Sequence, residues 1–189
     1  YTFQADFVDP LSERTKLEYG LKSHLAPDRT SLEVLVSSPT FGDQVRDTAL
    51  SNTYWINDNI NAAYINWSQK LSANWSMLAG LRFEQTWFEA EVEDKGTYRY
   101  HYPDGTNDIG RALFPSLYLV RRWAGSDREV QVNFSRKIER PRHWQIMPFI
   151  MFSDARNVRI GNPTLAPAMS NLAEVNHLLP LLGGKGTWL

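Results

Sequence analysis

Apolar and polar residues alternate along several stretches of the chain. Between residues 75 and 87, one set of alternate positions is Trp75, Met77, Ala79, Leu81, Phe83, Gln85 and Trp87. The positions between them are Ser76, Leu78, Gly80, Arg82, Glu84 and Thr86. Similar alternation is found near residues 16–25, 63–71 and 129–138. Successive side chains of a β-strand point to opposite faces of the sheet, so the pattern predicts strands with one apolar and one polar face.

The alternation and the residues that interrupt it predict about eight strands. The strands are expected near residues 1–8, 15–25, 57–71, 74–91, 111–123, 128–138, 171–181 and 187–189. Short connections at one end of the sheet would be 9–14, 72–74, 124–127 and 182–186. Long connections rich in Gly, Pro, Asn and charge would lie at the other end, at 26–56, 92–110 and 139–170. Antiparallel neighbours joined in this way are typical of outer-membrane β-barrels, which have short periplasmic turns and long extracellular loops.

A β-sandwich or a lipocalin-like barrel would show the same alternation with its apolar face turned inward. Three observations favour a membrane barrel instead. The strand expected at 74–91 is about twice the usual length of about 5–6 residues. Every second connection between strands is long, which soluble sandwiches do not normally show. The polar face also carries charge of both signs, as at Arg82 and Glu84, which suits a water-filled lumen.

Composition agrees with this prediction but does not decide it. The chain has 189 residues, a hydrophobic content of 42% and a net charge of -1, and its mean hydropathy is -0.42. No apolar run approaches the roughly 20 residues of a membrane helix. The absence of cysteine excludes disulfides and thiolate metal sites. The near-neutral charge argues against nucleic acid as a partner.

Both ends of the sequence lie in apparent strands. Tyr1 falls within the first strand, and Leu189 follows the start of another. We therefore expect residues 1–189 to be part of one barrel domain and to form a curved open sheet. The rival interpretation is a closed eight-stranded barrel, in which the first strand pairs with the last. No start methionine or signal peptide is present from which targeting could be read.

Four segments resemble the barrel domain of TonB-dependent outer-membrane receptors, especially the outer membrane protein β-barrel group. They are AGLRFEQT (79–86), LFPSLYL (113–119), FSRKIERPRHWQIMPF (134–149) and GNPTLAPAMSNLAEV (161–175). Their order and approximate spacing are those of the family, although none of them is diagnostic alone. Met147 stands where the family usually has Asn, and Ala168 where it usually has Glu.

The resemblance implies a transmembrane barrel of about 22 strands, of which this chain would supply about a third. It also implies a Gram-negative outer membrane, a plug domain and TonB as partners in the parent protein, and a small-molecule or oligosaccharide ligand. A surface lipoprotein is a further candidate partner. The expected function is import of a scarce, bulky nutrient such as a metal chelate, a vitamin or a glycan. The alternatives are a barrel that scaffolds a surface complex without import and a soluble carbohydrate-binding β-domain.

Candidate binding residues follow the strand that ends near Ile138. Pro141 cannot donate to a ladder and ends regular pairing. Arg140 and Trp144 would then either line the mouth of the lumen and contact a ligand, or anchor the loop. In the anchoring interpretation, Arg140 pairs with a carboxylate and Trp144 packs on the wall. Asn162 lies in an expected turn and is a further binding candidate.

Charged and aromatic side chains on the strands suggest two further features. Arg82 and Glu84 are two residues apart on the polar face, so we expect an ion pair in the lumen. Trp75, Trp123 and Trp188 lie one or two residues from expected periplasmic turns, where an interfacial aromatic girdle would be found.

Catalytic motifs are not found in the sequence. The four His residues lack metal-ligand spacing, and neither a phosphate-binding Gly loop nor a nucleophile elbow is present. We therefore expect a protein that is not an enzyme and has no catalytic residues, cofactor or metal.

Overall fold

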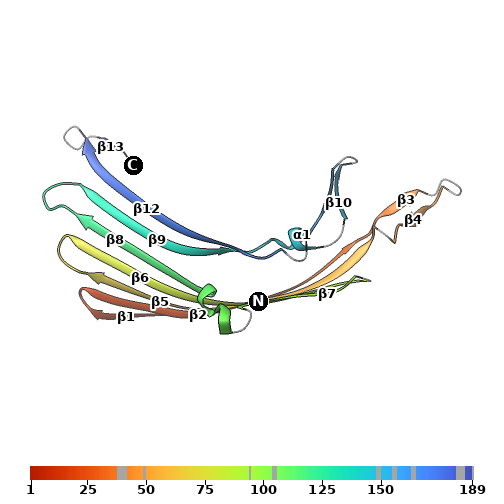
Figure 1. Ribbon diagram of the computed structural model, residues 1–189, viewed down its shortest axis with the longest axis horizontal. Coiled ribbons are helices and arrows are strands. Elements are labelled where there is room, and N and C mark those ends of the chain that lie inside the picture. The colour runs from red at the N-terminus through yellow and green to blue at the C-terminus, as the bar shows by residue number, and fades with distance from the viewer. Residues whose placement is uncertain are drawn as a thin grey trace.

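The computed structural model describes most of the chain as antiparallel β-structure (Figure 1). The described residues are 1–37, 42–48, 50–93, 95–103, 106–147, 150–154, 157–162, 165–181 and 186–188. Figure 1 shows long strands that run side by side and curl into an open trough, with short turns gathered at one end. The open, curved sheet of antiparallel strands predicted from the sequence is therefore confirmed.

The strands of the main sheet follow one another in chain order. They are β1 (Thr2–Ser12), β2 (Thr15–Leu32), β5 (Asn52–Lys70), β6 (Trp75–Val92), β8 (Leu113–Arg122), β9 (Glu129–Glu139), β12 (Ala168–Leu181) and β13 (Gly186–Trp188). Among the described residues, β1 and β13 are the two edges, and no ladder joins them. The rival closed eight-stranded barrel is therefore not what the structure shows.

Two strands are longer than the alternation predicted. β2 continues past residue 25 to Leu32, and β5 begins at Asn52 rather than near residue 57. They pair along their whole length, from Thr15 opposite Gln69 to Leu32 opposite Asn52. Alternation fades after Leu25 because proline, charged residues and Thr/Ser follow it, but the ladder continues since each strand supplies the other's backbone partners. β1 likewise extends to Ser12, which shortens the turn expected at 9–14.

The long connections contain structure of their own. The first holds the hairpin of β3 (Leu35–Ser37) and β4 (Gln44–Arg46). The second holds β7 (Gly96–Tyr102), which pairs with β6, and the 3-10 helix η1 (Thr106–Arg111). The third holds α1 (His143–Ile146) and the hairpin of β10 (Ile150–Asp154) and β11 (Asn157–Ile160). In Figure 1, β3, β4, β7 and β10 lie toward the end opposite the short turns, as the alternating connection lengths predicted.

The two faces of the sheet have opposite character. The face with Arg82 and Glu84 is called the inner face, because the segment after β9 folds back onto it. The other, outer face carries large apolar side chains that remain exposed: Phe3, Phe7, Leu21, Ile65, Trp67, Leu81, Phe83, Leu117, Val132, Phe134 and Val175. A continuous exposed apolar surface of this extent marks contact with a membrane or a partner.

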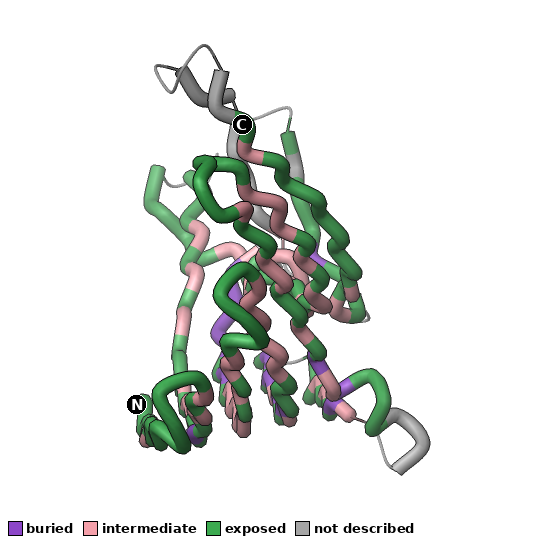
Figure 2. The backbone as a smooth tube through the Cα atoms, turned by 90° about the vertical axis from the view of Figure 1, so that its left-hand side faces the viewer, coloured by how far each residue is buried: buried purple, intermediate pink, exposed green. Residues whose placement is uncertain are grey.

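Buried residues are few and lie among many exposed and intermediate ones (Figure 2), and the largest buried cluster packs on the inner face toward the long connections. It comprises Tyr54, Ile56, Phe88, Ala90, Val92 and Met147. A second small cluster of Tyr102, Ala112 and Phe114 lies beside it. The wall is thus packed where the long connections cover it and bare along its outer face.

Gly20 makes room for a polar contact across the inner face. The Tyr64 hydroxyl donates to Asp6 Oδ1 at 2.5 Å across this position. A Cβ on Gly20 would lie 2.7 Å from Tyr64 Cε1 and 2.7 Å from the carbonyl oxygen of Ala5. Both distances are too short for a side chain at this position.

We expect Gly20→Ala to lower the free energy of unfolding of the protein in lipid vesicles by about 1–3 kcal/mol, the usual cost of overpacking. Urea unfolding followed by tryptophan fluorescence measures the change. Gly110→Ala is the control, because a Cβ there meets no atom within 4 Å. Equal costs for the two variants would contradict this account of Gly20.

The outer face provides a second prediction. Phe134 lies opposite Leu117 and Ala173 in the apolar outer row, whereas Asn133 points to the inner face. Phe134→Arg should destabilise the barrel by about 2–4 kcal/mol near the bilayer midplane, and Val132→Arg similarly. Asn133→Arg should be tolerated. Folding into lipid vesicles measures all three, and an equal cost at 133 and 134 would refute the assignment of the faces.

Candidate functional site

The side chain of Glu84 joins the wall of the sheet to the segment that follows β9. Arg82 Nε lies 2.9 Å from Glu84 Oε1, and Arg140 Nη2 contacts Glu84 Oε2 from the other side. Arg140 also donates to Thr86 Oγ1 from Nε at 3.2 Å and from Nη2 at 2.9 Å. Glu84 is only 7% exposed, and a carboxylate buried to this extent requires charged partners.

Arg82 is held in place on the inner face by an aromatic ring as well. Its guanidinium carbon lies 5.3 Å from the ring centroid of Phe114 on β8. A guanidinium can stack on a ring while its N–H groups bind a carboxylate in the plane. Two strands, β6 and β8, and the segment after β9 therefore meet at one charged cluster, formed by Arg82, Glu84, Thr86, Phe114 and Arg140.

Backbone hydrogen bonds fix α1 against the chain that follows β11. Gly161 N–H donates to the Met147 carbonyl at 3.0 Å, and Asn162 N–H donates to the Gln145 carbonyl at 2.6 Å. A Cβ on Gly161 would collide with the backbone of Met147, so this position needs glycine for close approach. Met147 is 1% exposed in the apolar core, which accounts for an apolar residue where the related pattern has Asn.

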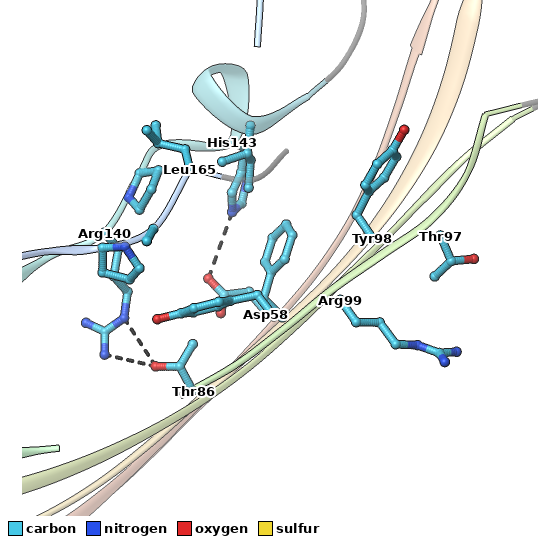
Figure 3. A pocket seen from close by; sticks show the side chains of 14 residues that line it. Asp58, Thr86, Thr97, Tyr98, Arg99, Arg140, His143 and Leu165 are labelled. Atoms are coloured by element: carbon cyan, nitrogen blue, oxygen red, sulfur yellow. Dashed lines mark hydrogen bonds and ion pairs between the residues drawn. The ribbon is translucent and has the colours of Figure 1, made fainter. Parts of the chain in front are cut away.

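A cavity of about 430 Å³ lies between this segment and β5, β6 and β7 (Figure 3). Its apolar lining includes Phe88, Tyr98, Tyr100, Ile146 and Leu165. Its polar lining includes Asp58, Thr86, Arg99, Arg140 and His143. Figure 3 shows Asp58, Thr86, Arg140 and His143 gathered at one side of the cavity. Aromatic walls with a few convergent polar groups are typical of small-molecule sites.

Two polar atoms at this cavity have no hydrogen-bond partner. Asp58 Oδ2 lies 3.9 Å from His143 Nε2, but Asp58 Oδ1 is buried without a partner. The Tyr100 hydroxyl is also buried without one, and desolvation raises the pKa of Tyr100 to about 12. The phenol therefore stays protonated at neutral pH. The cavity offers an unmatched acceptor and an unmatched donor, each costly to leave unpaired.

The residues selected from the sequence are only partly brought together. Arg140 lines the cavity. Trp144 is 44% exposed and does not line it, and Asn162 meets α1 through its backbone. Of the three girdle residues, Trp75 and Trp123 lie near short turns, while the side chain of Trp188 falls outside what the structure describes.

Sequence reasoning missed Asp58, Phe88, Tyr100 and His143. A signal was available in β6, where the even positions change from Arg82, Glu84 and Thr86 to Phe88, Ala90 and Val92. An inner face that becomes apolar in this way must be covered by another part of the chain. Tyr98, Tyr100 and Tyr102 alternate likewise in β7.

Within the part of the chain that the structure describes, no three His, Asp or Glu side chains gather closely enough to hold a metal ion. No helix among these residues is long and apolar enough to cross a membrane.

The chain matches the outer membrane protein beta-barrel family over residues 1–184. Comparison with curated proteins gave no significant match, and comparison with solved structures gave none either. The family match covers nearly all of the 189 residues, and the sheet has the apolar outer face and polar inner face of a membrane barrel. The chain therefore belongs to the outer membrane protein β-barrel family, whose members lie in the outer membrane of Gram-negative bacteria.

Proposed function

We propose that this chain is a wall segment of a TonB-dependent receptor that imports a scarce, bulky nutrient such as a metal chelate, a vitamin or a glycan. The observation that carries the proposal is the segment after β9, which folds onto the inner face and encloses a cavity there. The cavity lies toward the long connections, which are extracellular in barrels of this kind. A ligand arriving from outside would meet it first.

The width of the sheet supports a large lumen. A closed barrel of about eight strands has an interior just wide enough for side chains to fill it. Here the eight strands of the main path follow a curve that does not bring β1 and β13 together. Open edges do not occur in hydrocarbon, because each unpaired N–H and C=O costs several kcal/mol. We propose that further strands complete the wall around a lumen wide enough for a plug domain and a bulky ligand.

The chemistry of the cavity supports an amphipathic ligand. Phe88, Tyr98 and Tyr100 offer rings for an apolar or sugar face, while Asp58 Oδ1 can accept and the Tyr100 hydroxyl can donate a hydrogen bond. Binding would give both atoms their missing partners. In this proposal the wall holds the ligand, and energised release into the periplasm belongs to the plug and TonB.

The sequence pattern is also compatible with a soluble carbohydrate-binding domain and with a non-importing scaffold. The outer-membrane family disfavours a soluble carbohydrate-binding domain. A non-importing scaffold would leave the unpaired polar atoms of the cavity without a role, whereas the import proposal gives them one.

Glu84 provides the first test of the site. Glu84→Gln leaves Arg82 and Arg140 without their shared counter-charge, and breaking a buried ion pair typically costs about 3–5 kcal/mol. We expect the segment after β9 to detach first, so limited proteolysis should cut within residues 140–147 many times faster. The control is Glu89→Gln, because Glu89 is 47% exposed beside Arg99 and such pairs contribute at most about 1 kcal/mol. Unchanged proteolysis of Glu84→Gln would contradict the anchoring role.

Import itself is tested in cells that lack the gene. Growth is compared with iron supplied as a ferric chelate, with cobalamin and with an oligosaccharide as the limiting nutrient. We expect loss of growth on one of the three, and an uncoupler of the proton gradient should abolish uptake of that nutrient in wild-type cells.

Cavity variants then locate the ligand. Asp58→Asn together with Tyr100→Phe should reduce uptake about tenfold, equivalent to about 1.4 kcal/mol of binding, while Glu89→Gln should leave it unchanged. Growth of the deletion strain on all three nutrients, with no energy-dependent uptake, would favour the non-importing scaffold.

A further inference from the structure

A stack of alternating aromatic and cationic side chains lies at the short-turn end of the sheet. The Arg121 guanidinium is 4.5 Å from the ring centroid of Trp123 and 5.3 Å from that of Trp75. Arg128 lies 5.5 Å from the Trp123 ring on the far side of the turn at 124–127. We call these four residues the tryptophan–arginine stack.

The stack belongs to the outer face. Arg121 pairs with Trp75 of β6 and with Val130 of β9. Leu119 and Val132, the next pair on the same face of these strands, belong to the apolar outer row. Arg121 is thus an exposed cation at the end of a row of lipid-facing side chains.

The cations of the stack have no counter-charge from the described part of the chain. Neither Arg121 nor Arg128 forms an ion pair with a carboxylate in the described residues. By contrast, Arg122 turns to the inner face, where its Nε lies 2.6 Å from Glu129 Oε2. Ring contacts of this kind can use the flat faces of a guanidinium, whose in-plane N–H groups can then donate to another acceptor.

We propose that the tryptophan–arginine stack binds the phosphate of an anionic phospholipid in the periplasmic leaflet of the outer membrane. Short turns of such barrels face the periplasm, and tryptophan rings near them lie at the level of the lipid headgroups. A guanidinium binds a phosphate through two parallel N–H groups. Charge complementarity and depth in the bilayer therefore select the same occupant, and neither depends on the proposed import function.

The test uses the full-length barrel purified in detergent, stripped of lipid and titrated with phosphatidylglycerol. Phosphatidylcholine with the same acyl chains is the comparison lipid. Native mass spectrometry counts the lipids bound. We expect wild-type protein to bind phosphatidylglycerol in preference to phosphatidylcholine, and the double variant Arg121→Gln/Arg128→Gln to lose that preference at least tenfold. Inorganic phosphate at millimolar concentration should not compete.

Arg122→Gln is the control, since it removes one neighbouring positive charge from the inner face and leaves the stack intact. It should bind phosphatidylglycerol as the wild type does. Equal losses in Arg122→Gln and in the double variant would overturn the proposal in favour of a general charge effect. Full competition by inorganic phosphate would overturn the choice of a lipid as the occupant.

Two further measurements keep the proposal open to refutation if the double variant fails to fold. If the wild-type protein shows no preference for phosphatidylglycerol at any salt concentration tested, the proposal is overturned. Arg121→Lys keeps the charge but removes the planar N–H pair, so its preference should fall while its fold, followed by circular dichroism, is unchanged. An Arg121→Lys protein with wild-type preference would show that the planar geometry has no role.

Discussion

The constraint on which the rest of the structure depends is that each backbone N–H and C=O in a bilayer must have a partner within the protein. β2, β5 and β6 meet it by pairing along nearly their full lengths, with 18 residue pairs between β2 and β5. Ladders this long continue beyond the roughly 9–11 residues that cross a bilayer. The extra length carries the wall past the membrane, and the cavity is built on that extension.

Beyond the membrane, the segment after β9 covers the inner face of the wall. The carboxylate of Glu84 holds that segment in place. Glu84 forms ion pairs with Arg82 of its own strand and with Arg140, which lies 56 residues away in sequence. A buried charge without partners costs several kcal/mol. The contact between Glu84 and Arg140 therefore fixes the position of the segment after β9 on the wall. In this position, Met147 packs in the apolar core with Ile56 and Phe88. The cavity is the space between this segment and the wall.

The sequence predicted the local part of this structure and missed the part that depends on contacts between distant residues. Alternation at 75–87 and 130–138 records which face of a strand meets lipid, so strand order, faces and turn positions could be inferred. The extension of β2 beyond Leu25 could not, because its partner strand stabilises it rather than its own pattern. Asp58, Tyr100 and His143 belong to three different connections or strands, and no spacing in the sequence brings them together.

Arginines on the inner and outer faces of the wall have different partners, and the surroundings give the reason. On the inner face, Arg82 and Arg140 contact the buried Glu84, where low polarity makes a protein counter-charge necessary. At the short turns, Arg121 turns outward between Trp75 and Trp123. There, water and headgroups lie within reach, so aromatic faces suffice to hold the cation without a carboxylate. An outward arginine would be costly in the hydrocarbon, which agrees with the position of Arg121 at the last pair of the ladder between β6 and β8.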